Sequence, residues 1–239
     1  MGNFPPSNLP VAASLPSCLT FSLSRPCTLP AEMAAHLQLL LDSDQAAGLG
    51  FAQGSKLLAY NRSPAKAAEL AAEVGSAQAE SPADLAVCSI TFSMLANDAA
   101  VEAVLSSFLQ GRQAAGDRAP PAALFIDCST VLPSTTRRLA ARAAAHGVGF
   151  VACPVFGRPD AAAAAQLIGI VAGGSAEQRE RVKALVGAAF AGRGWGWGPA
   201  AGGAGAAFGA ACALADVLLW GRLHSVVLCS ALFCRAASD

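Results

Sequence analysis

Short apolar runs alternate with amphipathic stretches along most of the chain. The runs are nearly continuous in apolar residues, which is typical of strands buried on both faces. Between them, apolar positions recur at helical spacing, with Pro30, Ser63 and Asn97 at expected helix starts. The expected strands are 57–60, 87–95, 122–130, 148–155 and 167–174, and the expected helices are 30–43, 64–74, 97–109, 133–147 and 175–190.

The alternation of strands and helices predicts the fold class. Apolar strands joined by helices indicate a parallel sheet that is covered on both faces. We therefore expect an α/β fold with a doubly wound, mostly parallel sheet. Ligands bind such sheets outside the carboxyl ends of the strands, so the residues that follow each strand are the candidates for a site.

The two ends of the chain break this pattern. Residues 1–30 carry six prolines and several serines but no acidic residue. Because proline cannot donate to a sheet, we expect no central strand there but a disordered leader, or a weakly transit-like peptide with Arg25 as its cation. Residues 201–239 are rich in Gly and Ala and then apolar, and we expect a helical tail.

Composition argues against several classes of partner. Charged residues make up 13% of the 239 residues, the formal net charge is zero and the pI is about 6.8. Neither nucleic acid nor an anionic membrane surface is therefore expected as a partner. The basic cluster Arg137, Arg138 and Arg142 is interpreted as a solvated helix face. The apolar segment 206–233 contains charged residues, so no membrane span is expected.

The eight cysteines do not indicate a metal centre. They form no CxxC pair, and no His cluster accompanies them, so no zinc site is expected. Several stand inside or at the ends of apolar runs, where a free thiol behaves as a small hydrophobic group. We therefore expect a reducing compartment, the cytoplasm or an organelle stroma or matrix, rather than a disulfide scaffold.

Polar residues follow two of the expected strands at positions where a ligand would bind. Asn61, Arg62 and Ser63 come after 57–60. Arg pairs with a ribose 2′-phosphate and Asn or Ser donates to it, whereas NAD sites usually place a carboxylate at this position. An ordinary solvated turn before a helix explains these residues equally well. Further on, Gly157 would let backbone N–H groups approach an anion.

Four segments, taken in order, resemble the β-hydroxyacid dehydrogenase family, which includes 3-hydroxyisobutyrate dehydrogenase and the 6-phosphogluconate dehydrogenases. "YNRSPAKAAEL" resembles its cofactor-selective turn, and "SML" resembles its segment beside the nicotinamide ribose. "IDCSTVLPSTTRRLA" and "ACPVFGRPDAAAAAQL" resemble its substrate-side motifs. The resemblance covers about residues 32–200, so residues 31–200 are expected to form a Rossmann-like, NADP-binding domain.

The resemblance implies an NADP-dependent oxidoreductase that acts on a small hydroxy acid or its aldehyde, with NAD as the less favoured cofactor. The cofactor-binding residues that it implies are Asn61, Arg62, Ser63, Met94, Leu95 and Thr130. The substrate-binding residues that it implies are Ser129, Thr130 and Gly157.

Two parts of the family pattern are missing. The family opens with a strand and a "G-x-G-x-M-G" loop that holds the pyrophosphate, whereas the helix at Glu32 follows the Pro-rich leader. We therefore expect the first strand and the glycine loop to be absent, and we interpret "GLGFAQG", residues 48–54, as a loop. Gly209 occupies the position of the catalytic lysine. Loss of such a general acid or base typically slows a reaction by about 10²–10⁴-fold.

Two interpretations of function follow. The chain is either an impaired NADP-dependent oxidoreductase or a non-catalytic NADP-binding or interaction relic of the same fold. A missing first strand would leave a gap in the sheet that invites self-association. An intact middle with unmatched ends is also what an incomplete or alternatively spliced gene product would show.

Overall fold

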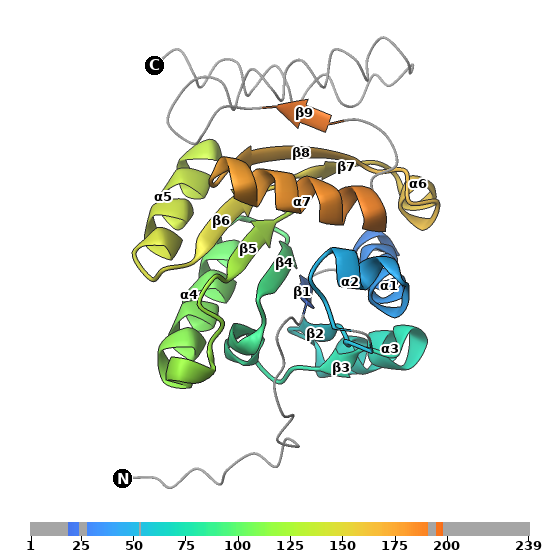
Figure 1. The fold of residues 1–239 in the computed structure, drawn as a ribbon, viewed down its shortest axis with the longest axis horizontal. Coiled ribbons are helices and arrows are strands. Elements are labelled where there is room, and N and C mark those ends of the chain that lie inside the picture. The colour runs from blue at the N-terminus through green and yellow to red at the C-terminus, as the bar shows by residue number, and fades with distance from the viewer. Residues whose placement is uncertain (1–18, 24–27, 53, 191–194, 198–239) are drawn as a thin grey trace, which may run out of the picture.

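A computed structural model describes residues 19–23, 28–52, 54–190 and 195–197 (Figure 1). The strands form one mixed sheet in the order β3-β2-β1-β4-β5-β6-β8-β7, and β9 pairs with β8. The strands are β1 Leu19–Leu23, β2 Leu58–Asn61, β3 Ala77–Gln78, β4 Ile90–Met94, β5 Leu124–Asp127, β6 Gly149–Ala152, β7 Val155–Phe156, β8 Ile168–Gly173 and β9 Trp195–Trp197.

Helices cover both faces of this sheet, as the alternating pattern predicts (Figure 1). Helices α1, α2, α3, α6 and α7 contribute to the hydrophobic cluster on one face, and η1, α4 and α5 to that on the other. The helices are α1 Thr28–Asp42, α2 Gln45–Gly48, α3 Pro64–Val74, η1 Pro82–Val87, α4 Asp98–Ala115, η2 Gly116–Arg118, α5 Pro133–Ala144, α6 Pro159–Ala163 and α7 Ala176–Ala189.

Side-chain alternation along each strand divides the core between the two faces. In β5, Leu124 and Ile126 belong to the cluster under α1 and α7, whereas Phe125 belongs to the cluster under α4 and α5. Phe125 stacks on Phe150 of β6 at a ring separation of 5.8 Å. Both sides of the sheet are therefore buried, which explains why these strands are almost entirely apolar in sequence.

Strand β1 corrects the expectation that the first strand is absent. It lies between β2 and β4 and pairs in parallel with both, so it is the central strand of the sheet. The proline argument failed because Pro16 and Pro26 lie outside the segment "LTFSL" and leave it free to donate on both sides. The gap from which self-association was inferred is therefore filled.

Three further features differ from the expected elements. Helix α4 continues to Ala115, beyond the expected end at residue 109. The short helix α2 lies between the expected helix 30–43 and the expected strand 57–60, where no helix was expected. Residues 153 and 154 interrupt the expected strand 148–155, which divides into β6 and β7. The expected tail at 201–239, and the leader apart from residues 19–23 and 28–30, lie outside the described residues.

The basic cluster of α5 is partly engaged with α4. Arg138 forms an ion pair with Glu102, and Arg142 donates to the Ser106 hydroxyl at 2.8 Å. Arg138 and Glu102 are exposed, as expected for a solvated helix face, whereas the contact between Arg142 and Ser106 is partly buried against α4. Among the described helices, none combines the length and the apolar character needed to cross a membrane.

Candidate functional site

The carboxyl ends of β1, β2, β4 and β5 meet at one edge of the sheet. The register places Leu23 opposite both Asn61 of β2 and Met94 of β4, and Ser93 opposite Asp127 of β5. The chain runs outward from β1 in one direction through β2 and β3 and in the other through β4, β5 and β6. Doubly wound sheets bind ligands at this reversal, so the crevice beside β1 is the candidate site.

The turn after β2 forms the open side of the site. The Asn61 side chain is buried, and its Oδ1 accepts a hydrogen bond from the Ser63 N–H at 2.9 Å. Ser63 is the N-cap residue of α3, but its side chain makes no capping bond. Arg62 is exposed between them and has no hydrogen bond or ion pair within the described chain. The turn therefore holds a guanidinium and a hydroxyl that are both available to a ligand.

The segment after β4 is locked to the segment after β5. The Ser93 hydroxyl donates to Asp127 Oδ1 at 2.8 Å, and the Ser129 N–H donates to the same oxygen at 3.1 Å. The Leu95 N–H in turn donates to the Ser129 hydroxyl oxygen at 2.8 Å. Ser93, Asp127 and Ser129 are all buried, so these bonds are shielded from water.

Burial sets the charge state of Asp127. Desolvation raises its pKa to about 6, and hydrogen bonds from Ser129 and Ser93 oppose this rise. A buried carboxylate is costly unless donors surround it, and here both a backbone N–H and serine hydroxyls do so. Asp127 is therefore ionised at neutral pH and acts as the acceptor at the centre of the network.

A second connection holds the start of α5 beside the start of α4. Asp98 Oδ1 accepts a hydrogen bond from the Leu132 N–H at 3.1 Å. A hydrogen bond from the Thr135 side chain, with the Leu132 N–H, holds the pKa of Asp98 below its ordinary value. Asn97 caps α4 as expected, accepting from the Ala100 N–H at 2.9 Å. The chain between residues 129 and 132 is thus fixed at both ends, and Thr130 within it is exposed.

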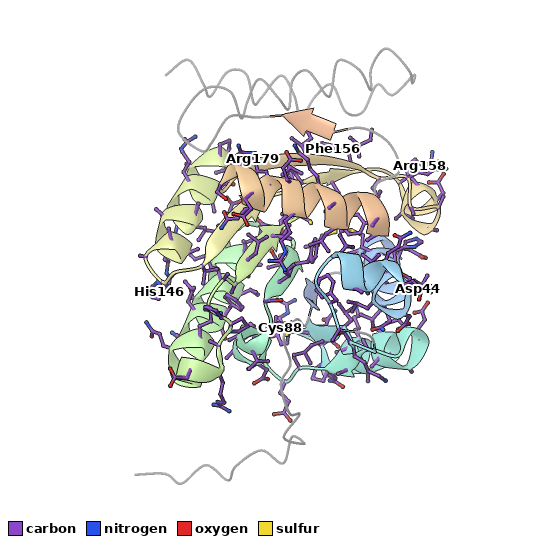
Figure 2. All side chains as sticks on the ribbon, in the orientation of Figure 1. Asp44, Cys88, His146, Phe156, Arg158 and Arg179 are labelled. Atoms are coloured by element: carbon purple, nitrogen blue, oxygen red, sulfur yellow. The ribbon has the colours of Figure 1, made fainter. Side chains whose placement is uncertain are left out.

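The segment after β6 continues along the same part of the sheet. The Cys153 N–H donates to the Asp127 carbonyl oxygen at 2.7 Å, which places this segment beside the β5 end. Phe156 lies in β7 alongside β8, and Arg158 lies at the start of α6 (Figure 2). Arg158 and Asp160 form an exposed ion pair at 3.4 Å, while Gly157 is exposed between the two elements.

Helix α6 is attached to the helix that follows β1. His36 Nε2 of α1 lies 3.0 Å from the Ala162 carbonyl oxygen and 3.1 Å from that of Ala163. Both partners are acceptors, so His36 Nε2 carries a proton and donates to them. This contact fixes the segment that follows Gly157 against the helix nearest the site.

The cysteines near the site do not provide a reactive thiolate. Cys128 and Cys153 are buried free thiols at the ends of neighbouring strands. A hydrogen bond with Cys153, together with burial, raises the pKa of Cys128 well above its ordinary value.

Cys88, labelled in Figure 2, is disulfide-bonded, which differs from the free state expected for it. The spacing of cysteines in a sequence does not reveal which of them come within bonding reach. Within the described ranges, no cluster of metal-ligating side chains is present.

The structure brings these expected site residues to one edge of the sheet, where they form two groups on either side of β1. Met94, Leu95, Ser129 and Thr130 belong to two interlocked segments, and Asn61 to Ser63 lie across β1 from them. Gly209, at the expected lysine position, lies outside the described residues. Sequence reasoning included Ser93 and Asp127 in the quoted motifs but gave them no role, and it missed Asp98. The available signal was an acid and a serine standing inside otherwise apolar runs, since buried polar groups require partners.

A family model for the NAD binding domain of 6-phosphogluconate dehydrogenase matches residues 46–193, more than half of the chain. The match begins within α2, so β1 and residues 24–27 lie outside it. Residues 24–27 read Ser-Arg-Pro-Cys and contain no glycine.

Individual relatives agree with this match. The uncharacterized oxidoreductase YfjR of Bacillus subtilis is 36% identical over 137 residues, which is 56% of this chain and 45% of that protein. The structure of 3-hydroxyisobutyrate dehydrogenase from Mycobacterium tuberculosis with L-serine has a TM-score of 0.62 and 26% identity, and the match covers 85% of this chain and 60% of that one.

A reductive aminase from Aspergillus terreus, in complex with NADPH and ethyl levulinate, shares the fold at a TM-score of 0.58 and 24% identity. The match covers 86% of this chain and 62% of the aminase. The chain therefore spans less than two thirds of the length of each of these relatives.

Proposed function

Because the chain belongs to the family of the NAD binding domain of 6-phosphogluconate dehydrogenase, we propose that it binds NADP across the carboxyl edge of its sheet. The observation that carries the proposal is the turn after β2. Arg62 has no partner within the described chain, and the Ser63 hydroxyl is not used as a cap. These groups match a ribose 2′-phosphate, since guanidinium pairs with phosphate oxygens and a hydroxyl donates to them.

The opposite side of the crevice would receive the nicotinamide half of the cofactor. Met94 is half-buried and Leu95 is buried, so together they offer an apolar border at the end of β4. Thr130 is exposed on the neighbouring segment. When bound, the nicotinamide would supply or accept a hydride, and the role of these residues is to hold and orient it.

The substrate class that we propose is a small hydroxy acid or the corresponding aldehyde or oxo acid. Support comes from the relative solved with L-serine, a small hydroxylated acid bound to a 3-hydroxyisobutyrate dehydrogenase. In this chain Thr130 offers an exposed hydroxyl, and Gly157 offers an exposed backbone where a larger residue would collide with Leu167. A hydroxyl and a backbone N–H can both donate a hydrogen bond to a small anion, and neither needs to carry a charge to do so.

A second candidate function is cofactor binding without turnover. Glycine at position 209, where the family resemblance places the catalytic lysine, has no side chain to exchange a proton. The sequence of residues 24–27 also contains no glycine, the residue that usually lets the backbone approach a pyrophosphate closely. We therefore propose that turnover by this chain is strongly reduced.

Titration calorimetry with NADPH and NADH tests the binding proposal. We expect NADPH to bind with a Kd below about 100 μM and more tightly than NADH. Arg62→Glu should weaken NADPH binding by about 10-fold or more, since a charge-assisted bond becomes a repulsion. Arg137→Glu, the same charge reversal on an exposed position of α5, is the matched control and should leave the Kd unchanged. Tighter binding of NADH than of NADPH would contradict the assignment of Arg62.

Turnover distinguishes the two candidate functions. NADPH oxidation should be followed at 340 nm with a panel of short aldehydes and oxo acids. Binding without detectable oxidation is expected from the non-catalytic candidate. Robust oxidation by the wild-type chain would show that the proposed loss of turnover is wrong.

A further inference from the structure

The Ser129 side chain is buried and is bonded inside the protein. A serine hydroxyl has one proton to donate and oxygen lone pairs that accept. Its oxygen accepts the Leu95 N–H at 2.8 Å. The Ser129 backbone N–H donates to Asp127 Oδ1 at 3.1 Å. Ser129 is also buried, so its hydroxyl is turned into the protein rather than exposed to a ligand in solvent.

Asp127 is held in place from several directions. Its Oδ1 accepts from the Ser93 hydroxyl of β4 and from the Ser129 N–H. Its backbone carbonyl accepts the Cys153 N–H, and its register partner in β6 is Ala152. The carboxylate therefore lies on a buried strand end and holds the backbone of Ser129 in the turn that follows.

The bonded chain runs from β5 to the segment after β4. Asp127 orients Ser129, Ser129 holds the N–H of Leu95, and Leu95 follows Met94 at the end of β4. Leu95 is buried and Ser129 is buried, whereas Thr130 is exposed. The hydroxyl that is free to meet a substrate is therefore that of Thr130.

We propose that Asp127 and Ser129 are positioning residues, which fix the Met94–Leu95 segment against the nicotinamide half of the cofactor, and that Thr130 rather than Ser129 faces the substrate. The proposal rests on the proposed function, because it concerns the same cofactor. Ser129 was expected from the sequence to contact the substrate, and the proposal instead assigns it the role of holding the segment after β4 in place.

Two binding probes separate positioning from cofactor binding in general. NADPH reaches both sides of the crevice, whereas adenosine 2′,5′-bisphosphate carries the 2′-phosphate but no nicotinamide. We expect Ser129→Ala to raise the Kd of NADPH about five-fold, the equivalent of one lost hydrogen bond, and to leave the Kd of the bisphosphate unchanged. Arg62→Glu should weaken both probes. Ser134→Ala, at an exposed position of α5, is the matched control and should change neither.

Hydrogen exchange examines the positioning contact without any ligand. The Leu95 amide should exchange faster in Ser129→Ala than in the wild-type chain, and Ser129→Thr, which keeps a hydroxyl, should restore both its protection and the Kd of NADPH. If Ser129→Ala does not fold, Asp127→Asn carries the test, because it keeps the shape of the side chain and one acceptor oxygen. The same selective loss of NADPH binding is expected from it.

The outcomes separate the two proposals. A wild-type chain that binds neither probe overturns the proposed function and this inference together. A wild-type chain that binds both probes, with equal changes or no change for both in Ser129→Ala, overturns this inference alone. Unchanged exchange of the Leu95 amide in Ser129→Ala also overturns it.

Discussion

The two sides of the candidate cofactor site are built in opposite ways. At the turn after β2, Arg62 is exposed without a partner in the described chain, and the Ser63 hydroxyl caps nothing. At the ends of β4 and β5, Ser93, Asp127 and Ser129 are buried and bond to one another. The open side can exchange water for a ligand at little cost, whereas the locked side fixes distances before any ligand arrives.

The largest expected difference between the two sides concerns a matched pair of serines. Ser93→Ala removes a donor from the buried, ionised Asp127 and should lower the free energy of unfolding by about 2 kcal/mol. Ser63→Ala removes a hydroxyl that bonds to nothing in the described chain and should change it by less than about 0.5 kcal/mol. Urea unfolding followed by circular dichroism measures both. Equal losses would show that the two sides are not built differently.

The second effect is expected in the pH dependence of stability, and it concerns the buried network of Ser93, Asp127 and Ser129. The pKa of Asp127 is about 6 in the folded chain, against an ordinary value of 3.8, so the folded state binds more protons between these values. Stability from this group is therefore present below the ordinary pKa and lost as the pH rises to about 6, by an amount on the order of 2 kcal/mol.

The difference in unfolding free energy between the wild-type chain and Asp127→Asn isolates this contribution. Asp98 and Glu102 act in the opposite sense, since their lowered pKa values make stability fall as the pH falls, but they are present in both proteins. A difference that stays constant between pH 4 and pH 7 would contradict the assigned state of Asp127.

A smaller effect is expected where the segment containing Thr130 is tied to α4. Asp98→Ala leaves the Leu132 N–H without its acceptor and should cost about 1 kcal/mol of unfolding free energy. Asp98→Asn keeps an acceptor oxygen and serves as the control, with about half that loss or less. If the two variants lose the same stability, the bond to Leu132 is not the cause.

The smallest expected effect concerns salt on the open side. Because Arg62 is exposed, its attraction for a 2′-phosphate is screened by ions. Raising the salt concentration from about 0.05 M to about 0.5 M should weaken NADPH binding about three-fold more than NADH binding. Calorimetry at both salt concentrations measures this ratio, and an equal loss for both nucleotides would place the 2′-phosphate away from Arg62.

The pattern of apolar positions predicted the fold class because burial on both faces leaves a strong signal. The strand at 57–60 and the helices at 64–74 and 97–109 match β2, α3 and the start of α4. Strand β1 was missed because prolines near a strand were given the weight of prolines inside it. The five residues of β1, which lie between Pro16 and Pro26, are enough for a strand when both neighbours supply bonding partners.

The candidate site was predictable only in part, for a different physical reason. The Arg62 turn is local, so its residues can be identified from adjacent positions. The bond between Ser93 and Asp127 depends on how β4 and β5 align, and that register is fixed by packing between distant segments. A local sequence pattern does not predict which serine will bond to a buried aspartate, so the network of Ser93, Asp127 and Ser129 could be identified only from the structure.

The central place of β1 also constrains the order in which the chain can fold. During synthesis this strand emerges first, yet both of its partners, Leu58–Asn61 and Ile90–Met94, are made later. Domains of this kind close such long-range pairings slowly, because loop-closure entropy must be overcome before the contacts form. The central part of the sheet is therefore complete only after β4 has been made, and a nascent chain released before that point lacks one side of the candidate site.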